Sequence, residues 1–153
     1  MLQEVGNNAA SLLPALDQVD AQAWIAKGAS ETYLAQLDSS KQQALALADG
    51  ARALARSPEK LSASLELYFR LAALETMFGS LQEGMRKYQG AEAAQSLATL
   101  YAQGGANRER FRRYIVNLAA EREHQFEVMD REAQRCRGTL MAPTPSNTPG
   151  RKK

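Results

Sequence analysis

The apolar residues between positions 67 and 88 recur at alternating spacings of four and three, the pattern of a helix that buries one stripe. The stripe consists of Leu67, Leu71, Leu74, Phe78, Leu81, Met85 and Tyr88. A second row widens the buried face, so this helix should contact more than one neighbour. That row is Leu61, Leu65, Tyr68 and Ala72. The pattern predicts a central helix over residues 58–89, with Ser57 as N-cap and Pro58 at the first position.

Two further long helices are predicted on either side of the central one. The first spans residues 31–56, and small residues on its inward face should let it approach a partner closely. The connection to the central helix is confined to Arg56, its last residue, and Ser57, which predicts an antiparallel hairpin. The last spans residues 108–137, follows Asn107 as cap, and has one interruption at Arg122. Its predicted inward face is Phe111, Ile115, Leu118, Phe126, Met129, Ala133 and Cys136.

Shorter elements and two irregular ends complete the prediction. Residues 11–27 should form two short helical pieces, with Ser11 as first cap, Pro14 in the first turn, Asp20 as second cap and Gly28 as a left-handed stop. Another short helix is predicted over residues 91–103, after Gly90 ends the central helix. Residues 1–10 are expected to be a loose lead-in. Residues 139–153 should form a disordered basic tail rich in proline and threonine, so the helical domain is placed at 11–138.

The predicted fold is therefore all-α, an elongated antiparallel bundle of three long helices with two or three short ones. The large side chains expected to anchor its core are Trp24, Tyr33, Leu71, Phe78, Phe111 and Phe126. Trp24 should plug one end of the bundle, with its indole N–H bound to an acceptor. Gly79 and Gly84 either permit close packing of the central helix or mark a bend, and the unbroken apolar rhythm favours packing.

The composition is that of a globular chain of 153 residues, with 44% apolar and 24% charged residues. Its formal net charge of +2 is unevenly distributed, because residues 1–105 carry 8 basic and 11 acidic side chains, whereas residues 106–153 carry 11 and 6. No apolar run is long enough to span a membrane, and residues 1–20 lack the pattern of a signal peptide. The chain is expected to be soluble, either cytoplasmic or exported after removal of a signal peptide.

One sequence motif suggests a metal site. Glu121 and His124 have the Glu-x-x-His spacing that places both side chains on one face of a helix, as in di-iron and di-manganese bundles. The chain has one histidine, so the second pair of such a site could come only from another copy. A solvated stretch with local ion pairs is the favoured interpretation.

A cluster of arginines opens the last long helix. Arg108 and Arg112 share a face, and Arg113 follows, so these guanidinium groups could bind an anionic partner. Cations at a helix N-terminus oppose the helix dipole, which indicates that Glu109 or acidic groups of neighbouring helices compensate them. Base-stacking aromatic residues are not interleaved with the arginines, so nucleic-acid binding is not expected.

The remaining chemistry is sparse. The single cysteine, Cys136, excludes an intrachain disulfide and leaves open an intermolecular one. No motif of nucleophilic catalysis or phosphate binding is present. The sequence favours a non-enzymatic scaffold or protein-interaction module without a cofactor, acting on a protein partner or by self-association. The alternatives are a metal- or ligand-binding bundle and an anion-binding surface.

Overall fold

The computed structural model describes residues 1–141, which form helices and no strand. The helices are α1 (Leu2–Asp17), α2 (Ala21–Ala26), α3 (Thr32–Ala55), α4 (Leu61–Tyr88), α5 (Ala91–Gln103) and α6 (Gly105–Met141). The predicted all-α class is confirmed. None of these helices combines the length and apolar character needed to cross a membrane. The chain divides into two compact units, Met1–Leu118 and a second that begins at Ala119, so α6 contributes to both.

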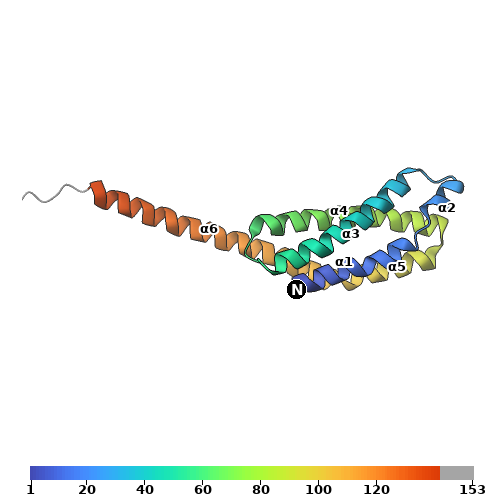
Figure 1. Cartoon of the computed structure of the whole chain (residues 1–153), viewed down its shortest axis with the longest axis horizontal. Coiled ribbons are helices and arrows are strands. Elements are labelled where there is room, and N and C mark those ends of the chain that lie inside the picture. Colours follow the sequence, from blue (N-terminus) through green and yellow to red (C-terminus); the bar gives the residue numbers. More distant parts are fainter. Residues whose placement is uncertain (142–153) are drawn as a thin grey trace, which may run out of the picture. The chain divides into compact units, whose positions relative to one another are not determined.

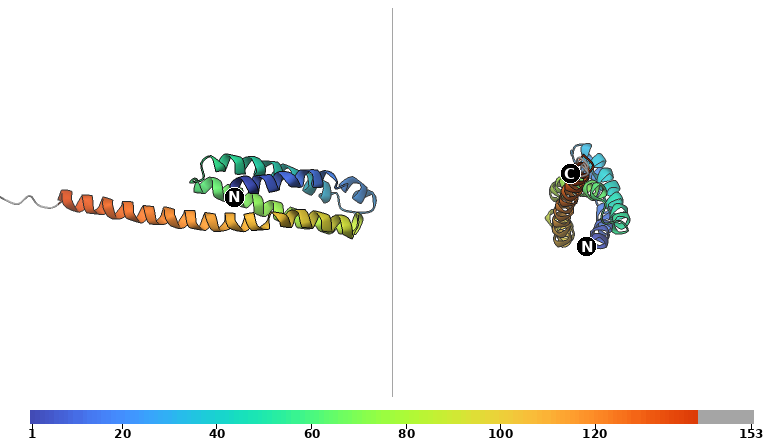
Figure 2. Two further views of the ribbon diagram at one scale, coloured as in Figure 1. Left: turned by 90° about the horizontal axis from the view of Figure 1, so that it is seen from below. Right: turned by 90° about the vertical axis from the view of Figure 1, so that its left-hand side faces the viewer.

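The first unit is built on four helices packed in a ring. Helix α1 packs against α3 and α5, and α4 packs against the same two helices. Consecutive members α3, α4 and α5 alternate in direction (Figure 1), and the end-on view of Figure 2 shows the helices gathered around a common interior. The three predicted long helices are present as α3, α4 and α6, and α1, predicted as a short piece beginning at Ser11, forms a full side of the ring.

The prediction of a loose lead-in over residues 1–10 is wrong, because α1 begins at Leu2. Its buried residues lie at spacings of three and four: Leu2, Val5, Ala9, Leu12 and Leu16. Ser11 is therefore not a cap, and its hydroxyl donates to the Asn8 carbonyl at 2.8 Å. Pro14 lies inside the helix instead of in its first turn. Burial of the apolar row outweighs the weak helix propensity of Gly6, Asn7 and Asn8.

Helices α1 and α3 meet through small side chains. Ala44 and Ala51 are fully buried, as expected from the small residues on the inward face of α3. A Cβ atom on Gly6 would lie 3.2 Å from the Ala51 Cβ and 3.2 Å from the Ala48 carbonyl oxygen. The two backbones are therefore close enough to require small residues on both sides.

An aromatic cluster closes one end of the first unit. Trp24 of α2 is fully buried, and its indole N–H donates to Gln89 Oε1 at 2.9 Å. Its ring lies 5.3 Å from that of Tyr33 and 6.0 Å from that of Tyr88, measured between centroids. Asp20 caps α2 by accepting from the Ala23 amide at 2.9 Å. This arrangement holds the short helix across the end of α3 and α4.

The connection between α3 and α4 is longer than predicted. Residues 57–60 form a turn, and α4 begins at Leu61 without a side-chain cap, so Ser57 and Pro58 do not start the helix. The Lys60 amide donates to the Ser57 carbonyl at 3.2 Å, which keeps this segment in a turn of its own. The antiparallel hairpin itself is present.

The two glycines of α4 differ in their surroundings. A Cβ on Gly84 would lie 2.7 Å from ring atoms of both Trp24 and Tyr33, whereas one on Gly79 would meet nothing within 4 Å. Close packing therefore explains Gly84 only, and the prediction is wrong for Gly79. Gly90, with φ of +118°, follows the last residues of α4 in a conformation that favours glycine.

Helix α6 departs most from the prediction. It begins at Gly105 instead of after an Asn107 cap, and Asn107 donates to Asn8 Oδ1 at 3.0 Å. Its buried residues are Phe111, Ile115 and Leu118, and none lies beyond them among the described residues. The helix also continues through Gly138 to Met141, so residues 139–141 belong to no tail. The rest of the predicted tail, 142–153, lies outside the described residues.

Candidate functional site

The second unit begins where the buried stripe of α6 ends. From Ala120 to Met141 every side chain is exposed. Phe126, predicted as a core anchor, is 73% exposed, and Met129 is 70% exposed. The predicted inward face beyond Arg122 is therefore wrong. The sequence sets the helical spacing of an apolar stripe, but burial of the stripe also requires a neighbouring element. The described residues of the second unit, up to Met141, supply none.

The exposed apolar residues of this segment are not scattered. Five of them recur at spacings of three and four, so they share one side of the helix. We call this set the C-terminal apolar face, which consists of Phe126, Met129, Ala133, Cys136 and Leu140. Single exposed apolar residues are ordinary on a protein surface, whereas a contiguous row is typical of a contact surface.

Charged and polar pairs lie along the helix beside this face. Arg131 is bound to Glu127 at 3.3 Å, Arg135 to Glu132 at 2.6 Å, and Gln134 donates to Asp130 at 2.8 Å. Each pair is local, with partners three or four residues apart. Such pairs contribute about 0.2–0.5 kcal/mol each to an exposed helix.

Glu121 and His124, the predicted metal ligands, lie at the start of the second unit. Both side chains are exposed, and Glu121 accepts from the Gln125 side chain at 3.4 Å. Within residues 1–141, no group of three or more histidine, cysteine, aspartate or glutamate side chains is placed to hold a metal ion. The structure thus offers this pair without a third protein ligand.

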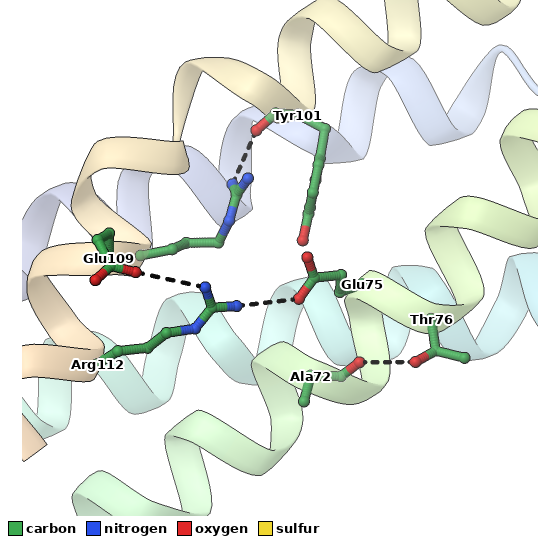
Figure 3. Close-up of polar contacts among 7 residues, drawn as sticks. Ala72, Glu75, Thr76, Tyr101, Glu109 and Arg112 are labelled. Carbon is green, nitrogen blue, oxygen red and sulfur yellow. Dashed lines mark hydrogen bonds and ion pairs between the residues drawn. The ribbon is translucent and has the colours of Figure 1, made fainter.

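The arginines predicted as an anion site belong to the first unit, and two of them are engaged there. The Arg108 guanidinium lies 3.9 Å from the centre of the Tyr101 ring and donates to the Tyr101 carbonyl at 2.8 Å. Arg112 lies between two carboxylates, 3.3 Å from Glu75 of α4 and 3.6 Å from Glu109 (Figure 3). These contacts compensate the cations at the start of α6 and connect it to α4 and α5.

The two other arginines of this stretch are more exposed. Arg110 lies 3.7 Å from Glu4 of α1. Arg113 is exposed. The predicted set Arg108, Arg112 and Arg113 is therefore divided between two side chains held in the first unit and one on its surface.

Tyr101 is the titratable group most affected by this cluster. Its hydroxyl points toward the Glu75 carboxylate (Figure 3) and has no hydrogen-bond partner among the described residues. Burial raises the pKa of this hydroxyl above its ordinary value of 10.0, and Glu75 raises it further, while Arg108 and Arg112 act in the opposite direction. The neutral phenol is therefore favoured in the folded protein.

A small cavity lies beside this cluster. It has a volume of about 20 Å³ and is lined by apolar residues of α1, α3, α4 and α5 together with Asn8, Tyr101 and Arg108. That volume is about what a single water molecule requires, and far less than the several hundred Å³ typical of small-molecule sites. The cluster of Tyr101, Arg108, Arg112 and Glu75 therefore joins helices and offers no room for a substrate.

Sequence reasoning missed the exposure of the C-terminal apolar face and left Leu140 out of it. The sequence feature that could have indicated this exposure is Arg122, which interrupts the inward apolar row of α6. The spacing there also changes, because Leu118, Arg122 and Phe126 follow each other at intervals of four, so the alternation of three and four starts afresh at Phe126.

Comparisons with protein-family models, with curated proteins and with solved structures found no match to this chain.

Proposed function

We propose that this chain is a non-enzymatic interaction module that binds a protein partner through the C-terminal apolar face of α6. One observation carries the proposal, namely a row of apolar side chains at helical spacing whose largest members, Phe126, Met129 and Leu140, are 70–85% exposed. Full burial of such side chains stabilises a complex by about 1.5–3 kcal/mol each. A partner helix is the natural complement of a row with this spacing.

The helical conformation of the same segment supports the proposal. Most helical stability in proteins comes from tertiary packing of an amphipathic face. The side chains from Ala120 to Met141 have no such packing, and their local pairs contribute little. A partner on the apolar face would supply the missing stabilisation.

The two alternative functions have less support. An anion site would have to draw Arg108 away from Tyr101 and Arg112 away from Glu75 and Glu109. A metal site at Glu121 and His124 would need ligands beyond this pair, since metal-binding bundles use four or more side chains.

Site-specific photo-crosslinking in cells that express the full chain tests the proposal. A photo-reactive amino acid in place of Met129 lies on the apolar face, whereas one in place of Arg131 lies on the side that pairs with Glu127. We expect a crosslinked protein product from position 129 and little from position 131. Absence of product at both positions, or equal product from both, would refute a partner bound at this face.

A further inference from the structure

We infer that the partner is a second copy of this chain, and that the two copies form a parallel, in-register two-stranded coiled coil through residues 122–140. The inference rests on the proposed function and specifies its partner. The apolar face supplies the seam, because Phe126, Ala133 and Leu140 occupy one heptad position, a, and Met129 and Cys136 the other, d. Both copies bring the same row, so the surface is complementary to itself.

Charge selects the parallel orientation. In a parallel, in-register dimer, a residue at position g of one helix lies beside the residue at position e of the other helix whose number is five higher. Charged pairs between these two positions determine which partner and orientation are preferred. Glu132 then lies beside Arg137 of the second copy, and by symmetry the pair occurs twice. Gln125 lies beside Asp130 of the second copy, where the amide can donate to the carboxylate.

The antiparallel orientation brings like charges together. With a positions packed against d positions of the second copy, the centre of the seam lies near residue 131. Asp130 then meets Asp130 of the second copy and Glu132 meets Glu132 at the centre of the seam, while Glu123 lies beside Arg137 of the second copy further out. That orientation matches large side chains with small ones, Phe126 with Cys136 and Met129 with Ala133, but the paired carboxylates oppose it along the seam.

Two properties of the seam set the expected strength of the dimer. It spans little more than two heptads, and Ala133 and Cys136 fill two of its five layers with small side chains. Arg122, one turn before Phe126, faces Arg122 of the second copy in this register, and its long side chain can keep its charge in water while its stem covers the end of the seam. The dimer should therefore be weak and concentration-dependent.

Light scattering or sedimentation of the purified full chain tests the association. Between about 10 and 500 µM, the average mass should rise from 16.8 kDa toward twice that value. Phe126→Glu should abolish the rise in mass. Val128→Glu should retain it, because this variant also replaces an apolar residue by glutamate, but at an exposed position outside the seam. A chain that stays monomeric throughout, or a dimer that Phe126→Glu leaves intact, would overturn the inference.

Disulfide formation tests the orientation. In the parallel register the two Cys136 thiols face each other, so oxidised glutathione should convert them to an intermolecular disulfide, with two glutathione thiols released per bond. An outward control carries Arg131→Cys together with Cys136→Ser. Crosslinking through Cys136 should be at least about tenfold faster than in this control, as expected for an intramolecular step with a raised effective concentration. Equal rates would overturn the parallel register.

These results separate the two proposals. If the purified chain is monomeric while the photo-reactive group at position 129 captures a protein of different mass in cells, the self-association fails and the interaction function stands. If position 129 captures nothing and the chain is monomeric, both fail.

Discussion

The two glycines in the second half of α4 permit a matched test of the packing around Trp24. Gly84→Ala would place a Cβ 2.7 Å from Trp24 Cζ3 and 2.7 Å from Tyr33 Cε1, whereas Gly79→Ala would place one in open space. Ordinary contacts between carbon atoms are about 3.5–4.0 Å, so the two rings must together give way by about 1 Å. Trp24 is fully buried and its indole is bound to Gln89, so it has little freedom to move.

The magnitudes follow from two opposing effects. Replacing glycine by alanine inside a helix stabilises it by about 1 kcal/mol. Overpacking of a buried contact costs about 1–3 kcal/mol, and Tyr33, which is only partly buried, can absorb part of the strain by moving outward. Gly79→Ala should therefore stabilise the first unit by about 1 kcal/mol. Gly84→Ala should destabilise it by about 1 kcal/mol, the overpacking cost less the gain in helix propensity.

Urea denaturation followed by tryptophan fluorescence measures the difference. Trp24 is the only tryptophan, so its emission reports the first unit, and far-UV circular dichroism provides a second probe. We expect the free energies of unfolding of the two variants to differ by about 2 kcal/mol at similar m-values. The same difference corresponds to a shift of about 4–8 °C in thermal midpoint. Equal stabilisation by both substitutions would show that Gly84 does not face Trp24 and Tyr33 at the distances described.

Three further tests, two of them with a control variant, probe the polar contacts of the first unit by the same denaturation assay. Gln89→Ala removes the acceptor of the buried Trp24 indole and should destabilise by about 1–3 kcal/mol, whereas Gln89→Glu retains that acceptor and should cost less. Arg108→Ala should destabilise the first unit by about 1–2 kcal/mol, because it removes the hydrogen bond to the Tyr101 carbonyl and the contact with the Tyr101 ring. The control, Arg113→Ala, should change stability by less than about 0.5 kcal/mol. Equal effects of the two substitutions would contradict the contacts described for Arg108. The raised pKa of Tyr101 means that the unfolded chain loses this proton first as pH increases, so its contribution is complete below pH 10.0 and is lost as pH rises through the folded-state pKa. Tyr101→Phe should therefore lose less stability than wild type between about pH 9 and pH 11, and parallel pH profiles would refute this assignment.

Several features of the fold follow from local sequence alone. Asp20 caps α2 because its carboxylate can reach the amide three residues on, and Gly28 and Gly90 have positive φ because glycine lacks a Cβ. The alternation of three and four along α4 identified its buried side, because residues at these spacings lie on one side of a helix. These effects act over a few residues, so they can be read without knowledge of the neighbours.

Other features depended on which elements meet. The segment at Gly6, Asn7 and Asn8 has low helix propensity, and only the packing of α1 against α3 and α5 shows why it is helical. The sequence could suggest a contact for both glycines of α4, but only the position of Trp24 and Tyr33 distinguishes Gly84 from Gly79. Arg112 gained its partner Glu75 from α4, which is distant in sequence, and Arg108 contacts Tyr101 because α5 and α6 meet there.

By itself the sequence determined that this protein is helical, where its apolar stripes lie, and that one stripe is interrupted at Arg122. Only the tertiary structure decided that the stripe is buried up to Leu118 and exposed from Phe126 to Leu140. The physical reason is that apolar residues at heptad spacing form a row that a second helix can cover. That helix can belong to the same chain or to another chain. Which of these covers it depends on where the remaining helices pack.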